Sequence, residues 1–143
     1  MKKKILIYGL PGSGKTWLAE RLQKHMDCSW FNADIIRGMA NDWSFDTNAR
    51  SRQARRMRNI ADYEKSVGHT VICDFVCPTN LTRYIFEADI SIYMDTIKEG
   101  RFEDTNKMFE KPGSREPTIN VIEFLSDDKI KELANKLLEM ENG

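Results

Sequence analysis

The sequence predicts an α/β fold in which a five-stranded parallel sheet is covered by helices on both faces. Two observations lead to this class: short apolar segments alternate with helical segments along the chain, and the first of these segments is apolar at successive positions. The 143 residues suit one domain, spanning 1–143. With 41% hydrophobic and 31% charged residues, the composition excludes collagen-like, disordered and membrane-spanning chains.

The N-terminal half supplies two predicted strands and two predicted helices. The run Lys4–Tyr8 is short, β-branched and bounded by a glycine, which is typical of a strand buried on both faces. A Gly-rich turn leads into a helix over about 14–26, and residues 29–32 form a weaker second strand. A long helical pattern within 46–68 has apolar residues at core spacing and reaches Gly68, a favourable C-cap.

The C-terminal half continues the alternation. Its predicted elements are a strand over 69–75, a short helix over 80–87, a strand over 89–94, a fifth strand over 118–125 and a final helix capped by Ser126. Residues 97–117 are charged and contain Pro112 and Pro117, so we expect a loop or short lid there. The final helix carries an apolar stripe for the core, formed by Ile130, Leu133, Leu137 and Met140.

The predicted strands end beside residues that can carry chemistry. These carboxyl ends fall near Gly9, Asn32–Asp34, Asp74–Phe75 and Asp95. Ligands of open parallel sheets bind beside the carboxyl ends of the strands, so we expect a functional site at this edge. For Asp95 itself, capping of a turn is the favoured role.

The strongest motif is Gly9-Leu-Pro-Gly-Ser-Gly-Lys15-Thr16, which matches the phosphate-loop pattern G-x-x-x-x-G-K-[ST] between a strand and a helix. Glycines in such a loop bare backbone N–H groups toward phosphate oxygens, and the helix N-terminus adds its positive dipole end. The predicted nucleotide-binding residues are Gly9, Gly12, Ser13, Gly14, Lys15 and Thr16. Lys15 would reach the β- and γ-phosphates, and Thr16 would ligate Mg²⁺. The alternative is a Gly/Pro-rich turn without a ligand.

Two carboxylates are candidates for the chemistry of a small kinase. ATP is favoured over GTP as the nucleotide because no guanine-reading Asn/Thr-Lys-x-Asp motif is present. Asp34 follows the second strand, where an acceptor hydroxyl would lie; the alternative is a helix N-cap. Asp74 ends an apolar strand, as a Walker B carboxylate that holds Mg²⁺ through water does; the alternative is an ordinary strand-end Asp. Which of the two is the base and which is associated with the metal stays open.

Five arginines gather in the long predicted helix, at positions 50, 52, 55, 56 and 58. Three interpretations stay open for them: a solvated face, a nucleic-acid footprint, or one or two side chains that bind an anionic substrate. The nucleic-acid interpretation is not favoured, because no Lys/Arg run or spaced aromatic platform accompanies the cluster.

The order of these motifs resembles that of the adenylylsulfate kinase (APS kinase) family of P-loop kinases over roughly residues 4–96. After the phosphate loop, the segments that carry the resemblance are Asn32-Ala-Asp34-Ile-Ile-Arg37, Phe45, Ala49-Arg50-Ser-Arg-Gln53-Ala-Arg55-Arg56, Phe75-Val-Cys77-Pro78 and Met94-Asp95-Thr96. The resemblance implies a P-loop kinase-like fold and transfer of the ATP γ-phosphoryl group to the 3′-hydroxyl of adenylylsulfate, a step of sulfate assimilation.

The resemblance also implies roles for individual residues. Asp34 would lie at the acceptor hydroxyl, Arg37 and Arg50 would bind the acceptor's phosphosulfate, and Phe45 would stack on its adenine. Further substrate positions match at Gln53, Phe75 and Cys77. The predicted catalytic residues are Lys15, Asp34, Asp74 and Arg101.

The sequence departs from the family's pattern at several of these positions. Asn32 stands in place of the first Asp of an Asp-Gly-Asp segment, and Asp74 stands where a small residue is usual. Gln53 replaces an Asn and Cys77 replaces a Ser. The lid of the family is longer; here Arg101 and Lys107 are candidate lid cations and Phe109 is a candidate base-stacking ring, and the alternative is a surface loop.

Two other function classes stay open. One is a kinase for a nucleoside, a nucleotide, or a modified base or 5′-end in nucleic acid; the other is a non-catalytic nucleotide-binding regulator. The net charge is zero, but residues 1–58 hold 12 basic and 5 acidic side chains (net +7) and residues 59–143 hold 10 and 17 (net −7), so the total does not argue against an anionic substrate. Three cysteines without a CxxC pair and no apolar run long enough to span a membrane indicate a cytoplasmic protein. A homodimer is one option for its assembly.

Overall fold

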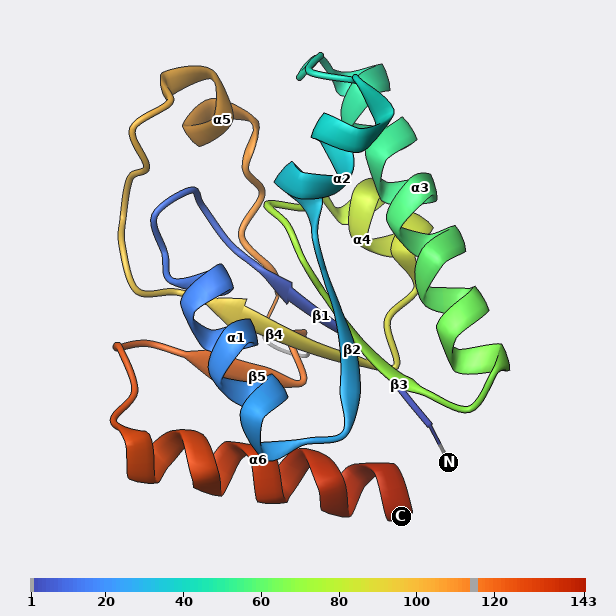
Figure 1. Cartoon of the computed structure of the whole chain (residues 1–143). Helices are drawn as coiled ribbons and strands as arrows, with labels where there is room; N and C mark the ends of the chain where they lie inside the picture. The colour runs from blue at the N-terminus through green and yellow to red at the C-terminus, as the bar shows by residue number, and fades with distance from the viewer. Residues whose placement is uncertain (1, 114–115) are drawn as a thin grey trace.

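The computed structural model describes residues 2–113 and 116–143 and contains a five-stranded parallel sheet in the order β2-β3-β1-β4-β5 (Figure 1). The strands are β1 (Lys4–Tyr8), β2 (Cys28–Asn32), β3 (Thr70–Asp74), β4 (Ile90–Met94) and β5 (Ile119–Val121). The helices are α1 (Lys15–His25), α2 (Ala33–Ala40), α3 (Thr47–Ser66), α4 (Asn80–Phe86), α5 (Glu103–Met108) and α6 (Asp127–Asn142). The predicted α/β class with five parallel strands is confirmed.

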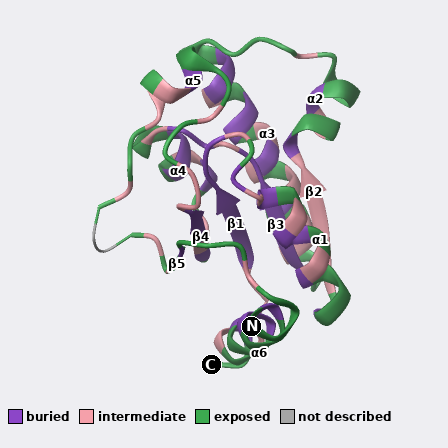
Figure 2. Ribbon diagram, turned by 90° about the vertical axis from the view of Figure 1, so that its left-hand side faces the viewer, coloured by how far each residue is buried: buried purple, intermediate pink, exposed green. Residues whose placement is uncertain are grey.

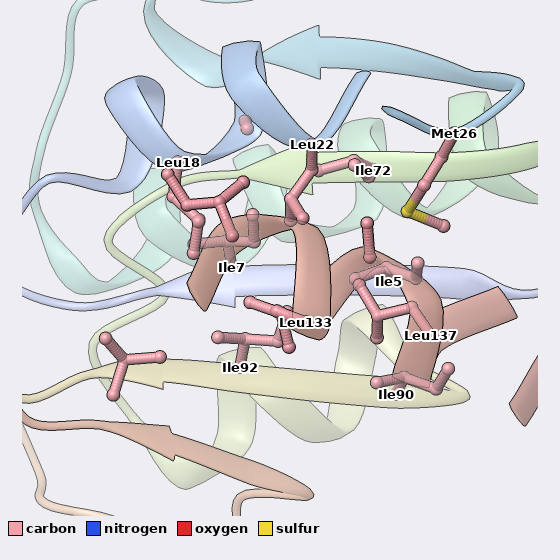
Figure 3. Close-up of a cluster of buried hydrophobic side chains, with 14 of the residues drawn as sticks. Ile5, Ile7, Leu18, Leu22, Met26, Ile72, Ile90, Ile92, Leu133 and Leu137 are labelled. Carbon is pink, nitrogen blue, oxygen red and sulfur yellow. The ribbon is translucent and has the colours of Figure 1, made fainter. Parts of the chain in front are cut away.

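Helices α1 and α6 cover one face of the sheet. Figure 3 shows Leu18 and Leu22 of α1 and Leu133 and Leu137 of α6 pointing toward isoleucines of the strands, such as Ile5. All of these side chains are buried. The predicted stripe of α6 therefore does pack into the core, and the leucines of α1 complete the same cluster.

Helices α3 and α4 cover the opposite face. Ala54, Met57 and Ala61 of α3 are fully buried against a second cluster that includes Leu6 of β1 and Phe86 of α4. Small side chains on α3 let that helix approach the strands closely. The sheet is thus enclosed between two apolar clusters, as a parallel sheet requires.

The central strands are buried along their whole length, whereas the edge is not. Figure 2 shows β1 and β3 as buried, and β2, at one edge, as intermediate throughout. The strands end on the side where α2 and the α5 segment lie (Figure 1). No helix in the described ranges 2–113 and 116–143 is long and apolar enough to cross a bilayer.

The fifth strand is shorter than the sequence predicts. Pairing with β4 covers only Ile119–Val121 instead of residues 118–125. Ile122 and Phe124 continue the apolar run but are mostly exposed, because the chain leaves the sheet there. The apolar composition of this run therefore overstated the length of the strand.

Two helices were not predicted as elements. Helix α2 packs Ala33 and Ile36 against the second cluster but carries Ile35 and Met39 outward, with exposed fractions of 64% and 80%. The predicted lid at 97–117 contains α5, a helix of six residues with Glu103 and Asp104 in its first turn. Residues 114 and 115 of that lid lie outside the described residues.

Candidate functional site

The phosphate loop follows β1 and crosses the end of the sheet as the motif predicts. Gly9 has φ +154°, and a Cβ there would lie 2.9 Å from the Met94 carbonyl oxygen, so only glycine permits this close crossing. Gly14, the N-cap of α1, has φ +96°, and a Cβ there would lie 2.7 Å from the ring of Phe124. The loop therefore depends on glycine for its path and leaves its backbone open toward the sheet edge.

Lys15 is buried and folds back over the loop. Its Nζ donates a hydrogen bond to the Leu10 carbonyl oxygen at 3.0 Å. Burial lowers the pKa of Lys15 to about 8, while the nearby carboxylates of Asp74 and Asp34 act in the opposite direction. No carboxylate among the described residues pairs directly with the ammonium group, so its charge is available to a phosphate.

Thr16 and Asp74 lie side by side at the ends of α1 and β3. The Thr16 hydroxyl donates to Asp74 Oδ1 at 3.2 Å, and the Asn32 amide donates to both Thr16 Oγ1 and Asp74 Oδ1 at 3.1 Å. The Trp30 indole Nε1 donates to Asp74 Oδ2 at 2.6 Å. Burial raises the pKa of Asp74, and the hydrogen bond from Trp30 opposes this shift.

This cluster fits the requirements of Mg²⁺. Magnesium prefers oxygen ligands and is commonly held by one or two carboxylates together with nucleotide phosphates. Thr16 and Asp74 supply a hydroxyl and a carboxylate at the foot of the phosphate loop. The described residues contain no group of three His, Cys, Asp or Glu side chains placed to hold a metal, so phosphates and water would complete the shell.

Asp34 lies in the first turn of α2 and is exposed on the pocket wall. The alternative role as N-cap is wrong, because the cap is Asn32, whose Oδ1 accepts from the Ile35 backbone N–H at 3.0 Å. Asp34 has no hydrogen-bond or ion-pair partner among the described residues. Its carboxylate faces the positive field of Lys15 and Arg50.

Arg37 and Arg50 form a basic wall around Phe45. Their guanidinium carbons lie 4.5 Å and 5.2 Å from the Phe45 ring centroid, which is cation–π geometry. Arg37 donates to the carbonyl oxygens of Asp42 and Ser44, at 3.0 Å and 2.8 Å. Burial lowers the pKa of both arginines, yet guanidinium groups remain charged at neutral pH.

Arg50 also joins α3 to the lid. Its Nε donates to the Phe45 carbonyl oxygen at 3.1 Å, and its Nη2 donates to the Thr105 hydroxyl at 2.8 Å. Thr105 is the buried residue of α5. The short helix is therefore tied to the basic wall through Arg50.

Three further predicted substrate residues are buried in the pocket wall. The Gln53 amide donates to the Ala33 carbonyl oxygen at 3.1 Å and accepts from Arg56, so it holds α2 against α3. Phe75 packs edge-to-face on Phe86, with 5.6 Å between the ring centroids. Cys77 has φ +46°, and burial raises the pKa of its thiol to about 12.

The lid residues differ in their position. Arg101 lines the pocket, and its guanidinium carbon lies 5.4 Å from the Phe102 ring centroid. Lys107 is exposed and does not line the pocket. The expected base-stacking role of Phe109 does not fit, because its ring stacks on Tyr93 at 5.9 Å and lies under the Arg83 guanidinium.

One pocket of about 1010 Å³ brings most of the predicted site together. The predicted site residues that line it are Gly12, Lys15, Thr16, Asp34, Arg37, Phe45, Arg50, Gln53, Asp74, Phe75, Cys77 and Arg101. Gly9, Ser13 and Gly14 lie in the loop but do not line the pocket. The sequence reasoning missed Trp43 and Phe102, two half-exposed aromatic residues in the lining, and Trp30 behind Asp74. The signal that could have indicated Trp30 is the strand register, which places Asn32 opposite Asp74. Trp30 lies two positions before Asn32 and therefore on the same face of β2.

Comparisons with known proteins identify a family. The family model for adenylylsulphate kinase matches residues 1–116, which extends the resemblance into the lid. No curated protein matches the chain.

Solved structures share the fold at low sequence identity. An adenylylsulfate kinase of Mycobacterium tuberculosis, in complex with AMPPNP and APS, is 19% identical with a TM-score of 0.73; the match covers 99% of this chain and 98% of that one. An unliganded sugar kinase of Janibacter sp. HTCC2649 is 16% identical with a TM-score of 0.75, covering 97% and 95%. A hexameric adenylylsulfate kinase of Thiobacillus denitrificans is 22% identical with a TM-score of 0.68, covering 96% and 29%.

The family match and the phosphate loop together define the general activity. The matched region contains the whole phosphate loop, the Asp74 strand and the three pocket arginines, Arg37, Arg50 and Arg101. The chain is an ATP-dependent phosphotransferase with a P-loop kinase fold, and it belongs to the adenylylsulfate kinase family.

Proposed function

We propose that this chain transfers the γ-phosphoryl group of ATP to the 3′-hydroxyl of adenylylsulfate, with Mg²⁺ as cofactor. One observation carries the proposal: a single pocket joins the phosphate loop to a wall that holds two buried arginines, with Asp34 exposed at that wall. Donor phosphates and an anionic acceptor can therefore meet beside one carboxylate.

The donor side supplies positive charge for the transferred group. The backbone N–H groups of the loop and the Lys15 ammonium would hold the β- and γ-phosphates. Thr16 and Asp74 would hold Mg²⁺, which neutralises charge that develops on the phosphate oxygens. Arg101, at the lid, also lines the pocket and would approach the transferring phosphoryl group.

The acceptor side supplies binding and a base. Arg37 and Arg50 would bind the phosphosulfate, and the exposed face of Phe45 offers a platform for adenine. Asp34 would accept the proton of the 3′-hydroxyl as that oxygen attacks the γ-phosphorus and the bond to the β-phosphate oxygen breaks. The products are ADP and the 3′-phosphorylated acceptor.

The test supplies purified protein with labelled ATP, Mg²⁺ and one acceptor at a time. We expect label on adenylylsulfate and none on its 3′-deoxy analogue, which binds alike but lacks the nucleophile. The rate of AMP phosphorylation, compared with that of adenylylsulfate, measures how much contacts between the sulfate and the basic wall contribute, because AMP lacks the sulfate. Lys15→Ala should remove most turnover, because the loop then lacks its cation.

Other acceptors separate the remaining function classes. Label on a nucleoside, a sugar or the 5′-end of an oligonucleotide, with none on adenylylsulfate, would replace the proposed acceptor. ATP binding without label on any hydroxyl compound would instead indicate a nucleotide-binding regulator.

A further inference from the structure

The carboxylate of Asp74 is fixed through both of its oxygens. Oδ2 accepts the indole N–H of Trp30 at 2.6 Å, the shorter end of such hydrogen bonds, while Oδ1 accepts from Thr16 and Asn32. Asp74 is only 2% exposed, so little of its side chain is accessible to solvent. Its two oxygens thus have different partners: Oδ2 faces the indole and Oδ1 faces the phosphate loop.

The register of the sheet creates this arrangement. Parallel pairing places Asn32 opposite Asp74 and Trp30 opposite Ile72. Side chains two positions apart on a strand share a face, so Trp30 and Asn32 both lie on the α1 side of β2. Trp30 packs against the core cluster of α1 and α6, which holds the indole ring in place.

Asn32 lies opposite Asp74 and avoids a repulsion between two carboxylates. A carboxylate at this position would lie opposite the Asp74 carboxylate and would repel it. The amide instead donates to Oδ1 at 3.1 Å. The neighbouring ends of β2 and β3 therefore carry one negative charge, on Asp74, and this is the carboxylate that the Trp30 indole orients.

We propose that Trp30 is a positioning residue for the magnesium site. The indole locks Oδ2, so that Oδ1 stays directed at Thr16 and at the metal position beside it. Without the indole, the carboxylate is able to rotate toward the Lys15 ammonium, which attracts it. The inference rests on the proposed function, because it requires Mg²⁺ between Thr16, Asp74 and the nucleotide.

The indole N–H gives a direct readout that does not depend on turnover. The chain has three tryptophans, so an ¹⁵N-labelled sample should give three indole signals, which Trp17→Phe and Trp43→Phe assign. ADP is added first in the presence of EDTA and Mg²⁺ afterwards. We expect the Trp30 signal to move on addition of Mg²⁺, and the Trp17 signal to move less. An unmoved Trp30 signal, at a Mg²⁺ concentration that calorimetry shows to saturate the ADP complex, would overturn the proposal.

The variant test uses Trp30→Phe, which removes the donor and keeps an aromatic ring. We expect the Mg²⁺ concentration that half-saturates the ADP complex to rise by about 10- to 100-fold. Losses of this size are typical when a residue that orients a metal ligand is removed. Affinity for ADP in EDTA should be unchanged. Trp17→Phe is the matched control, because Trp17 packs against the same core cluster but its indole contacts Phe124 rather than Asp74.

A double-mutant cycle separates positioning from a general structural role. In an Asp74→Asn background, Trp30→Phe should cause no further loss of Mg²⁺ affinity. An equal loss in both backgrounds would refute action through Asp74. This readout needs only ADP and Mg²⁺, so it does not depend on the choice of acceptor. If the variants show the expected changes in Mg²⁺ affinity but adenylylsulfate takes up no label, the proposed acceptor is wrong and the role of Trp30 stands.

Discussion

Lys15 should reduce the stability of the empty protein, so Lys15→Met is expected to stabilise it. The side chain is 9% exposed, and burial lowers its pKa from 10.5 to about 8. A pKa shift of that size means that keeping Lys15 charged in the folded state costs on the order of 3 kcal/mol of stability. Methionine has a similar length and no charge, so the free energy of unfolding at pH 7 should rise by up to about 3 kcal/mol.

The gain should have a particular pH dependence. The folded-state pKa lies below the unfolded-state value, so the cost of Lys15 is fully present below pH 8. It is relieved as the pH rises from about 8 toward 10.5, because folded molecules release the proton first. The stability gap between Lys15→Met and wild type should therefore close over this window.

Urea denaturation at pH 7 and at pH 10, followed by circular dichroism, measures both quantities. Lys131→Met in α6 is the matched control, since Lys131 is exposed and should change stability by no more than about 0.5 kcal/mol. A Lys15→Met protein that is no more stable than wild type at pH 7, or whose gain persists unchanged at pH 10, would refute the reasoning.

Three further predictions concern the acceptor wall and the core. Asp34→Asn should lower kcat by about 100-fold or more, with ATP affinity near normal, as measured by turnover and calorimetry; a collapse of ATP affinity would place Asp34 at the metal instead. Arg50→Lys should raise the KM for the acceptor because Lys cannot reproduce its two hydrogen bonds, whereas Arg55→Lys, at an exposed arginine, should not. Leu22→Ala should cost about 3 kcal/mol in urea denaturation, because Leu22 is fully buried between α1 and α6; a cost below about 1 kcal/mol would contradict the packing described here.

The sequence was sufficient to predict the sheet and the glycine-rich loop between β1 and α1, because both depend on local patterns. An apolar strand, a glycine-rich turn and a helix in succession fix the position of Lys15 and Thr16 within a few residues of chain. The same kind of local pattern predicted too long a strand for β5. There the apolar run continues to Phe124, yet that ring leaves the sheet and contacts Gly14 and Trp17, which are far away in the sequence.

The pocket wall formed by α2, α3 and the α5 segment was harder to predict because its geometry depends on contacts between elements. Helix α2 is short and exposes the apolar Ile35 and Met39, so the pattern of its apolar residues did not mark it in the sequence, and its cap is Asn32 rather than Asp34. Phe109 is aromatic and lies in the predicted lid, but the ring is held by Tyr93 and Arg83 from other elements. Residue type alone did not distinguish a ring that packs from a ring that faces the pocket.

The arginine-rich helix shows how the structure decides between interpretations that composition leaves open. Arg52 and Arg56 pair with the Asp42 carboxylate at 2.7 Å and 3.0 Å, and Arg58 pairs with Asp62 and Glu87. Within the described part of the chain, only Arg55 of this cluster lacks a hydrogen-bonding or ion-pair partner.

These pairings argue against a nucleic-acid footprint on α3. A face that binds a phosphate backbone needs several cations that are not already neutralised. Here the Asp42 carboxylate engages two guanidinium groups, and the carbonyl of the same residue accepts from Arg37. Asp42 therefore ties Arg52 and Arg56 of α3 to the loop that carries Phe45, and Arg50 is the member of the cluster that lines the pocket.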